Sequence, residues 1–128
     1  MENRLRLFLT LFFLPSALFA QETIDRKFEM KEYYLVFLKK GPNRGQDSAA
    51  AAQIMKGHLE HLTKLYEEDK VSVCGPLLDD CDIRGICIYH LSDSTLVRQL
   101  AEADPAVRSG RLTVEIDPWY SAKGMVLK

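Results

Sequence analysis

Apolar and polar positions alternate along the chain in a way that predicts strands and helices in turn. The segment 33–40 (YYLVFLKK) is aromatic and apolar and stops at Gly41-Pro42, which is typical of a central strand. A polar loop follows, and residues from the expected N-cap Ser48 to about Asp69 repeat apolar positions at helical spacing. The apolar stripe of this helix contains Ile54, Met55, Leu59, Leu62, Leu65 and Tyr66.

The second half of the chain gives the same alternation. Two short strands are predicted at 71–76 and 86–90, with a polar connection between them. A second helix is expected to start at one of the polar residues 92–94. It should stop before Pro105, because the residue before a proline disfavours helical geometry. Apolar and polar residues then alternate at 111–117, which predicts the last strand.

The predicted order of elements, βαββαβ, indicates a ferredoxin-like α+β fold. In this arrangement two helices cover one face of a four-stranded antiparallel sheet. The chain offers nothing to cover the other face, and pairing with a second copy is the common solution for a sheet of this size. We therefore expect a homodimer.

The start of the chain has the layout of a secretory signal peptide. Two arginines precede an apolar run at 7–14, and a small residue, Ala20, stands at the expected cleavage point. A retained membrane anchor is the alternative, although the run is short for a bilayer. We expect a signal peptide at 1–20, a lead-in at 21–30 and one domain at 31–128. Cleavage would leave a periplasmic or secreted protein without a membrane segment.

Charge and cysteine content narrow the function classes. The net charge is −1 and no basic stripe follows the chain, which argues against nucleic acid as a partner. In an oxidising compartment Cys74, Cys81 and Cys87 allow at most one internal disulfide, and buried reduced thiols are the alternative. Their spacing is not that of a zinc site.

One histidine lies where an apolar residue would be expected. His58 falls inside the apolar stripe of the first helix, and such a histidine is most often a core residue with one satisfied nitrogen. Asp104, before Pro105, is a good N-cap, but the fold also allows it to meet His58. In that case Asp104 would accept a hydrogen bond from Nδ1–H and leave Nε2 as a general base near neutral pH.

Other chemistries find little support in the sequence. It contains no Ser-His-Asp arrangement with a nucleophile elbow and no glycine-rich phosphate loop. His58 and His61 are close enough to share a ligand, yet no third ligand is placed beside them, so we expect neither a metal nor a cofactor. Phosphoryl transfer through His58 would need a phosphate-binding loop that the chain lacks.

Several motifs, in order and at matching spacing, resemble the YciI-like (YCII-related) family. The segments GHLEHLTKLYEEDKVSVCGPLLDDCDIRGICIY and AEADPAVRSGRLTVEIDPWY carry the resemblance. His58, Gly75-Pro76 and the Asp104-Pro105 pair followed by Gly110 match the family's histidine, Gly-Pro and D-P…G elements. The resemblance implies a dimeric α/β barrel of ferredoxin-like subunits. It also implies a small-molecule site with a His–Asp pair, and relatives that include lactone dehalogenases.

These observations lead to two functional hypotheses. The first is a small enzyme in which His58 and Asp104 act as general acid/base on a small organic acid or lactone, by proton abstraction, elimination or isomerisation. The second is a non-catalytic dimer that binds a small ligand. Arg84, Trp119 and Tyr120 are the candidate substrate-binding residues. The plainer interpretation is that Arg84 is solvated and that the two aromatics only pack.

Overall fold

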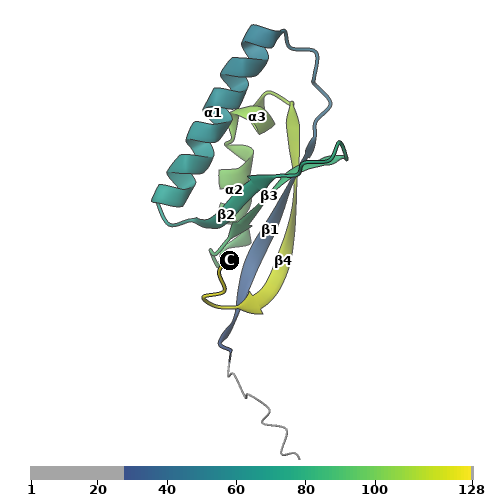
Figure 1. Cartoon of the computed structure of the whole chain (residues 1–128). Helices are drawn as coiled ribbons and strands as arrows, with labels where there is room; N and C mark the ends of the chain where they lie inside the picture. The colour runs from purple at the N-terminus through teal and green to yellow at the C-terminus, as the bar shows by residue number, and fades with distance from the viewer. Residues whose placement is uncertain (1–27, 128) are drawn as a thin grey trace, which may run out of the picture.

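The chain folds into one antiparallel sheet with its helices on one side (Figure 1). The computed structural model describes residues 28–127, and the predicted signal peptide lies outside them. The elements are β1 (Met30–Lys40), α1 (Ser48–Glu67), β2 (Val71–Pro76), β3 (Ile83–Tyr89), α2 (Ser94–Glu102), α3 (Pro105–Arg108) and β4 (Leu112–Ala122). The strand order β2-β3-β1-β4, with every pair antiparallel, confirms the ferredoxin-like α+β fold.

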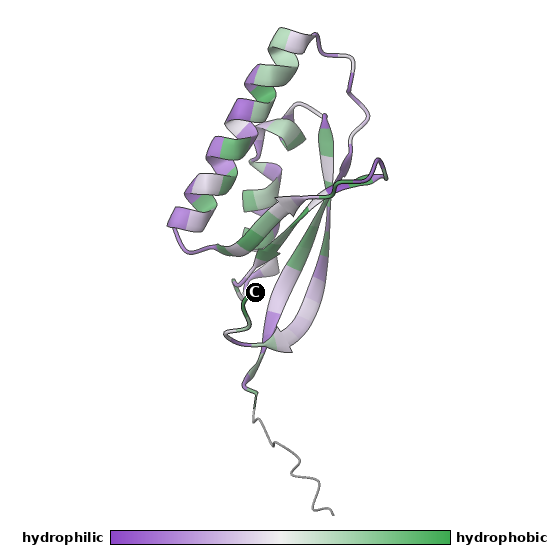
Figure 2. Ribbon diagram, viewed as in Figure 1, coloured by the Kyte–Doolittle hydropathy of each residue, from purple (hydrophilic) through white to green (hydrophobic). Residues whose placement is uncertain are grey.

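The hydrophobic core lies between the sheet and the helices. Val36 and Leu38 of β1 and Tyr89 of β3 point to this side, where they meet Leu65 of α1 and Val97 of α2. Figure 2 shows the apolar colouring concentrated on the strands beneath the helices and on the sides of the helices that face the sheet. Among the helices of residues 28–127, none has the length and apolar character needed to cross a membrane.

The first helix has a different N-cap from the one predicted, and the structure contains a third helix in addition to the two of the predicted element order. Asp47, not Ser48, caps α1, because its carboxylate accepts a hydrogen bond from the backbone N–H of Ala50 at 2.8 Å. Asp93 caps α2 in the same way. Between the second predicted helix and the last strand, the short helix α3 begins at Pro105, and its N-cap is Asp104.

Three of the four strands are longer than their apolar patterns predicted, and β2 has the predicted bounds. β1 begins at Met30 and not at Tyr33, because its first residues pair with the end of β4. β3 begins at Ile83, since it pairs with β1 on one side and β2 on the other. β4 continues through Pro118 to Ala122. An edge strand tolerates proline, whose missing N–H is not needed on the open side.

Part of the apolar stripe of α1 does not enter the core. Met55, Leu59 and Tyr66, predicted on the buried side, are 46%, 56% and 66% exposed. The helix rests on α3 and β2 and leaves a cavity between its apolar side and the edge of the sheet. These side chains line that cavity, so the apolar stripe identified a site wall as well as a core contact.

Two of the three cysteines are paired. Cys74 of β2 and Cys87 of β3 are directly opposite each other in the ladder and form a disulfide across the two strands. Cys81, in the hairpin loop between these strands, is a free thiol. The sequence left disulfide and reduced thiols open, and the register of β2 on β3 decides between them.

Candidate active site

His58 and Asp104 are in contact. His58 lies on the buried side of α1 and is 8% exposed, and Asp104, at the start of α3, is 1% exposed. The His58 Nδ1 atom is 2.6 Å from Asp104 Oδ2, so the imidazole N–H donates to the carboxylate. The other carboxylate oxygen, Oδ1, accepts the backbone N–H of Ala106 at 2.8 Å. Asp104 is therefore both a helix cap and the partner of His58.

A glycine beside His58 lets the two helices approach. A Cβ atom on Gly57 would lie 3.2 Å from Cγ and 3.3 Å from Cβ of Pro105, which is tighter than most side-chain contacts. Pro105 is the first residue of α3 and follows Asp104 directly. Close packing of Gly57 on Pro105 thus brings the neighbouring pair, His58 and Asp104, within hydrogen-bond distance.

The contact fixes the ring of His58 and leaves one nitrogen available. With Nδ1–H held by Asp104, Nε2 is the atom that carries the lone pair, and no side chain or backbone group of residues 28–127 hydrogen-bonds to it. Burial raises the pKa of the nearby core phenol of Tyr89, and the negative charge of Asp104 raises it further. Asp104 and Tyr89 are each 1% exposed, so water has little access to the carboxylate.

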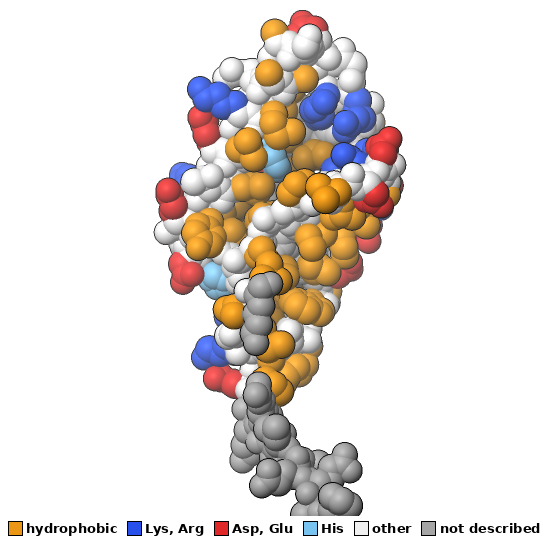
Figure 3. All heavy atoms as spheres, in the orientation of Figure 1, with side chains coloured by type: hydrophobic (Ala, Val, Ile, Leu, Met, Phe, Trp, Pro, Cys, Tyr) orange, Lys and Arg blue, Asp and Glu red, His pale blue; other side chains and the backbone are white. Residues whose placement is uncertain are grey.

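The ring of His58 forms part of the wall of a cavity of about 760 Å³. This cavity lies between α1 and the strands β2 and β3, and its wall is mostly apolar: Leu38, Ile54, Met55, Leu59, Leu62 and Leu112 belong to it. Figure 3 shows hydrophobic side chains gathered over this face of the molecule, with lysines and arginines at its upper end. A cavity of this size, apolar with a few polar groups, is typical of small-molecule sites.

Arginines supply most of the charge in the cavity wall. Arg84, a candidate from the sequence, lines it, as do Arg44 of the β1–α1 loop and Arg111, which precedes β4. Neither Arg44 nor Arg111 was among the residues predicted from the sequence. Arg44 is a single arginine in a polar loop and Arg111 stands at the start of a predicted strand. Nothing in their neighbours signals that the fold directs them to the cavity.

The aromatic candidates lie elsewhere. Trp119 and Tyr120 are on β4, opposite Tyr33 and Glu32 of β1, and neither belongs to the wall of the cavity. The rings of Trp119 and Tyr33 stack at an angle, with 6.0 Å between their centroids. Within one copy of the chain, Trp119 and Tyr120 do not lie in the wall of the cavity that contains His58. The contacts within one copy therefore do not support their predicted role in substrate binding.

The other histidines have structural partners. His61 Nε2–H donates to the carbonyl oxygen of Leu100 at 2.9 Å, and His90 lies between the hydroxyl of Ser72 and the carbonyl oxygen of Asp69. Over residues 28–127, no three His, Cys, Asp or Glu side chains are grouped so that they could hold a metal ion. The ionisable groups in the cavity wall are the imidazole of His58, which is paired with Asp104, and three guanidinium groups, and Thr63 and Ser72 add hydroxyls.

The sequence of the domain matches a known family model. The model of the YCII-related domain aligns with residues 33–120, from β1 to the end of the sheet, and includes His58, Asp104 and all three cavity arginines. The chain belongs to the YCII-related domain family. Comparison with curated protein sequences gave no match.

A solved structure has the same fold as this YCII-related protein. It is 5-chloro-2-hydroxyhydroquinone dehydrochlorinase from Burkholderia phenoliruptrix AC1100, in complex with 2,5-dihydroxybenzoquinone. The two chains share 24% sequence identity, and the match covers 68% of this chain and 92% of the other, with a TM-score of 0.51. At this identity the likeness establishes a common fold.

Proposed function

We propose that this YCII-related protein is a small enzyme that uses His58 as general acid/base on a small organic acid or lactone. The observation that carries the proposal is the 2.6 Å hydrogen bond between His58 and Asp104 at the wall of an apolar cavity. A base in such a place is oriented, held in one tautomer and partly shielded from water. Asp104 is the positioning residue of the pair.

The reaction class follows from what one oriented imidazole can do. Nε2 of His58 takes a proton from a carbon beside a carbonyl group, and the electron pair of the broken C–H bond moves into the substrate. In an elimination that pair forms a double bond, and a leaving group such as chloride departs with its own electrons. In an isomerisation the imidazolium returns the proton to another carbon. Asp104 stabilises the imidazolium and does not itself take the proton.

The dehydrochlorinase supports the elimination branch of this proposal. That enzyme's name describes loss of hydrogen chloride from a small hydroxylated ring, and its structure holds a six-membered dihydroxyquinone. A ring of this size fits within a cavity of about 760 Å³. Chlorinated hydroxyquinols and chlorolactones are therefore the first compounds to assay.

We further propose that the active form is a homodimer. Along β1 and β3 the residues that alternate with the core positions are apolar: Leu35, Phe37, Ile86 and Ile88. They lie on the sheet face opposite the helices, and all four are partly exposed in one copy of the chain. A second copy with the same apolar face would cover them.

Export from the cytoplasm remains part of the proposal. The signal-peptide pattern at 1–20 supports it, and so does the disulfide between Cys74 and Cys87, which an oxidising compartment maintains. Fractionation of cells that express the full chain, with mass determination of the mature N-terminus, tests this part directly.

The experiment that tests the enzyme is hydrogen exchange at carbon. Wild type and His58→Asn are incubated in D₂O with a panel of chlorinated hydroxyquinols, chlorolactones and lactones, and NMR follows deuterium uptake and chloride release. We expect His58→Asn to lose at least 10²-fold in rate, whereas the control His61→Asn keeps the wild-type rate. Equal rates in wild type and His58→Asn would refute a role for His58. Binding that depends on His58 without any exchange or turnover would identify the non-catalytic dimer instead.

A further inference from the structure

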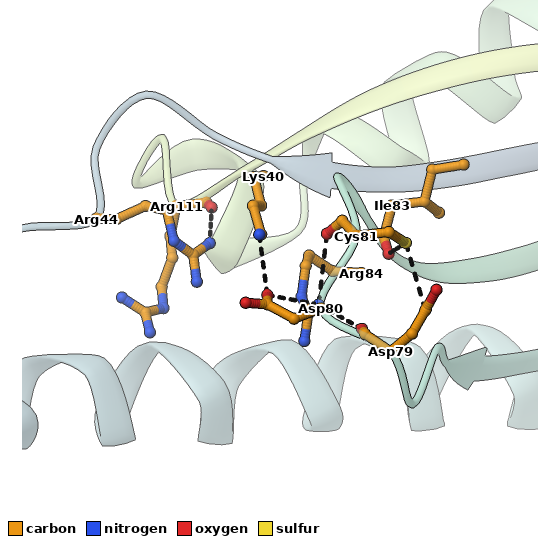
Figure 4. A network of polar contacts seen from close by, with 8 residues as sticks. All are labelled: Lys40, Arg44, Asp79, Asp80, Cys81, Ile83, Arg84 and Arg111. Carbon is orange, nitrogen blue, oxygen red and sulfur yellow. Dashed lines mark hydrogen bonds and ion pairs between the residues drawn. The ribbon is translucent and has the colours of Figure 1, made fainter.

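Three arginines from separate parts of the chain meet at one end of the cavity. Arg44 lies in the loop between β1 and α1, Arg84 in β3, and Arg111 immediately before β4. Figure 4 shows their side chains with Lys40 on the side of the sheet that faces α1. A guanidinium or ammonium group in an apolar wall is stabilised by a nearby negative charge. A group that has no acidic partner in the protein is therefore available to bind an anionic ligand.

Arg84 and Lys40 already have acidic partners. The acidic hairpin loop between β2 and β3 supplies them: Lys40 Nζ is 2.9 Å from Asp80 Oδ1, and Arg84 Nη1 is 3.5 Å from the same oxygen. Arg84 also donates to the carbonyl oxygen of Asp79 at 2.9 Å. Lys40, then Arg84 and last Arg44, hold the pKa of the Asp80 carboxyl below its usual value. Lys40 and Arg84 thus share the one carboxylate of Asp80, which balances part of their charge.

Arg44 and Arg111 have only neutral partners. Arg44 Nη1 donates to the backbone carbonyl of Arg111 at 3.0 Å, and Arg111 Nη1 donates to the side-chain oxygen of Gln46 at 3.0 Å. Neither arginine forms a salt bridge with any carboxylate of the described chain, residues 28–127. These bonds orient the two guanidinium groups without neutralising them, and both line the cavity. The Asp80 carboxylate attracts Arg44 only at longer range, because its contacts are with Lys40 and Arg84.

The backbone that carries the two arginines is closely packed. A Cβ atom on Gly41 would lie 2.2 Å from the carbonyl oxygen of Gly110, so only glycine permits this approach. The backbone N–H of Gly41 donates to the backbone carbonyl oxygen of Arg111 at 3.0 Å, and the N–H of Asn43 donates to the carbonyl oxygen of Gly110 at 2.9 Å. Gly110 has a φ of 73°, which glycine adopts without strain. The two segments are therefore fixed to each other before any ligand arrives.

We infer that Arg44 and Arg111 form a subsite for the anionic group of the substrate, and that this substrate is a small organic anion. A carboxylate or an ionised ring hydroxyl would accept hydrogen bonds from both guanidinium groups, which suit planar oxyanions. The apolar wall takes the rest of the molecule, and the reacting carbon faces His58. The inference rests on the proposed function and deepens it, because it favours acids and ionised quinols over neutral lactones.

The test compares two probes of the same shape and different charge. Benzoate and benzamide are titrated into wild type, Arg44→Gln and Arg111→Gln, and their dissociation constants are measured by ligand-observed NMR. The control, Arg98→Gln, removes an arginine of α2 that is paired with Glu102 and does not line the cavity. Circular dichroism and urea unfolding confirm that each variant is folded, and Arg44, on an exposed loop, is the variant least expected to disturb folding.

We expect wild type to prefer benzoate. Each cavity variant should weaken benzoate binding about tenfold, the effect of losing one charge-assisted hydrogen bond, and leave benzamide binding unchanged. Added salt should weaken benzoate binding alone. Equal affinity for the two probes in wild type, no benzoate binding at all, or variants that bind benzoate like Arg98→Gln would overturn the subsite.

The experiments distinguish a wrong assignment of the anion subsite from a wrong assignment of enzymatic activity. Selective benzoate binding without carbon exchange in any compound would uphold the subsite and refute the enzyme. Turnover that depends on His58 but is confined to neutral lactones would uphold the enzyme and overturn the subsite.

Discussion

Asp104 gives one carboxylate oxygen to His58 and the other to the first turn of α3. Oδ2 lies 2.6 Å from His58 Nδ1, across 46 positions of sequence, and Oδ1 accepts the N–H of Ala106 two residues away. A side chain that would otherwise only end a helix therefore also orients an imidazole. Because the two oxygens have separate partners, substitutions can separate the two roles.

Asp104→Asn and Asp104→Ala should differ in stability but agree in activity. Asparagine keeps an oxygen that can cap α3, so we expect a loss of less than about 1 kcal/mol in the free energy of unfolding. Alanine removes the cap and leaves His58 unpaired, at a cost of about 2–3 kcal/mol. The amide of asparagine donates to Nδ1 and moves the imidazole proton to Nε2, so both variants should lose general-base activity. Urea unfolding measures the difference in stability, and ¹⁵N NMR reports which nitrogen of His58 carries the proton. An unchanged tautomer in Asp104→Asn would contradict the predicted proton shift.

Gly41→Ala should destabilise the fold, and Gly45→Ala in the same loop should not. The new Cβ on residue 41 would overlap the carbonyl oxygen of Gly110, whereas a Cβ on residue 45 meets nothing within 4 Å. Overpacking against backbone costs about 1–3 kcal/mol. Thermal unfolding of both variants measures the difference. Equal stability of the two would show that the loop and the start of β4 are not fixed to each other.

Removal of the disulfide between Cys74 and Cys87 should lower stability. The bond joins cysteines 13 positions apart, and closing a loop of this length in the unfolded chain is worth about 3 kcal/mol in the loop-entropy description. We expect the double variant Cys74→Ala/Cys87→Ala to lose about that amount in urea unfolding. Cys81→Ala, which removes the free thiol, is the matched control and should retain wild-type stability. A reductant should destabilise wild type and leave the double variant unaffected.

Alkaline pH should destabilise the protein partly through Tyr89. Burial raises the pKa of its phenol above the ordinary value of 10.0. Below pH 10 both the folded and the unfolded state keep this proton. As pH rises above that value, the unfolded state loses the proton while the folded state retains it, so the free energy of unfolding falls. Tyr89→Phe should show a smaller decline between about pH 9 and 11, measured by urea unfolding at each pH. Identical declines in the two proteins would count against this assignment.

A charge on the open sheet face should break the proposed dimer. Phe37 alternates with the core residues Val36 and Leu38 and therefore lies on the face opposite the helices. In Phe37→Asp, sedimentation equilibrium should give the mass of one chain, against two for wild type. Leu78→Asp, at a fully exposed position of the hairpin loop between β2 and β3, is the control and should sediment like wild type. A wild-type protein that sediments as a single chain would refute the dimer.

The sequence by itself determined the order of the elements, the fold class and the family. The strand at 33–40 and the helix that follows Ser48 have strong local patterns, and those patterns depend only on neighbouring residues. Their exact ends were less predictable. β3 and β4 extend beyond their apolar runs because their partners in the sheet supply the hydrogen bonds, and a partner strand lies far away in sequence.

Only the tertiary structure decided which chemical groups meet. His58 was identifiable as an imidazole on an apolar stripe, but its distance to Asp104 depends on how α1 packs on α3. Cys74 and Cys87 pair because the register of β2 on β3 places them opposite each other, and a shift of one residue would separate them. Arg44 and Arg111 carry no local signal, since one is a single arginine in a polar loop and the other the first residue of a predicted strand. Their convergence on the cavity results from the contact of Gly41 with Gly110, which joins the end of β1 to the start of β4.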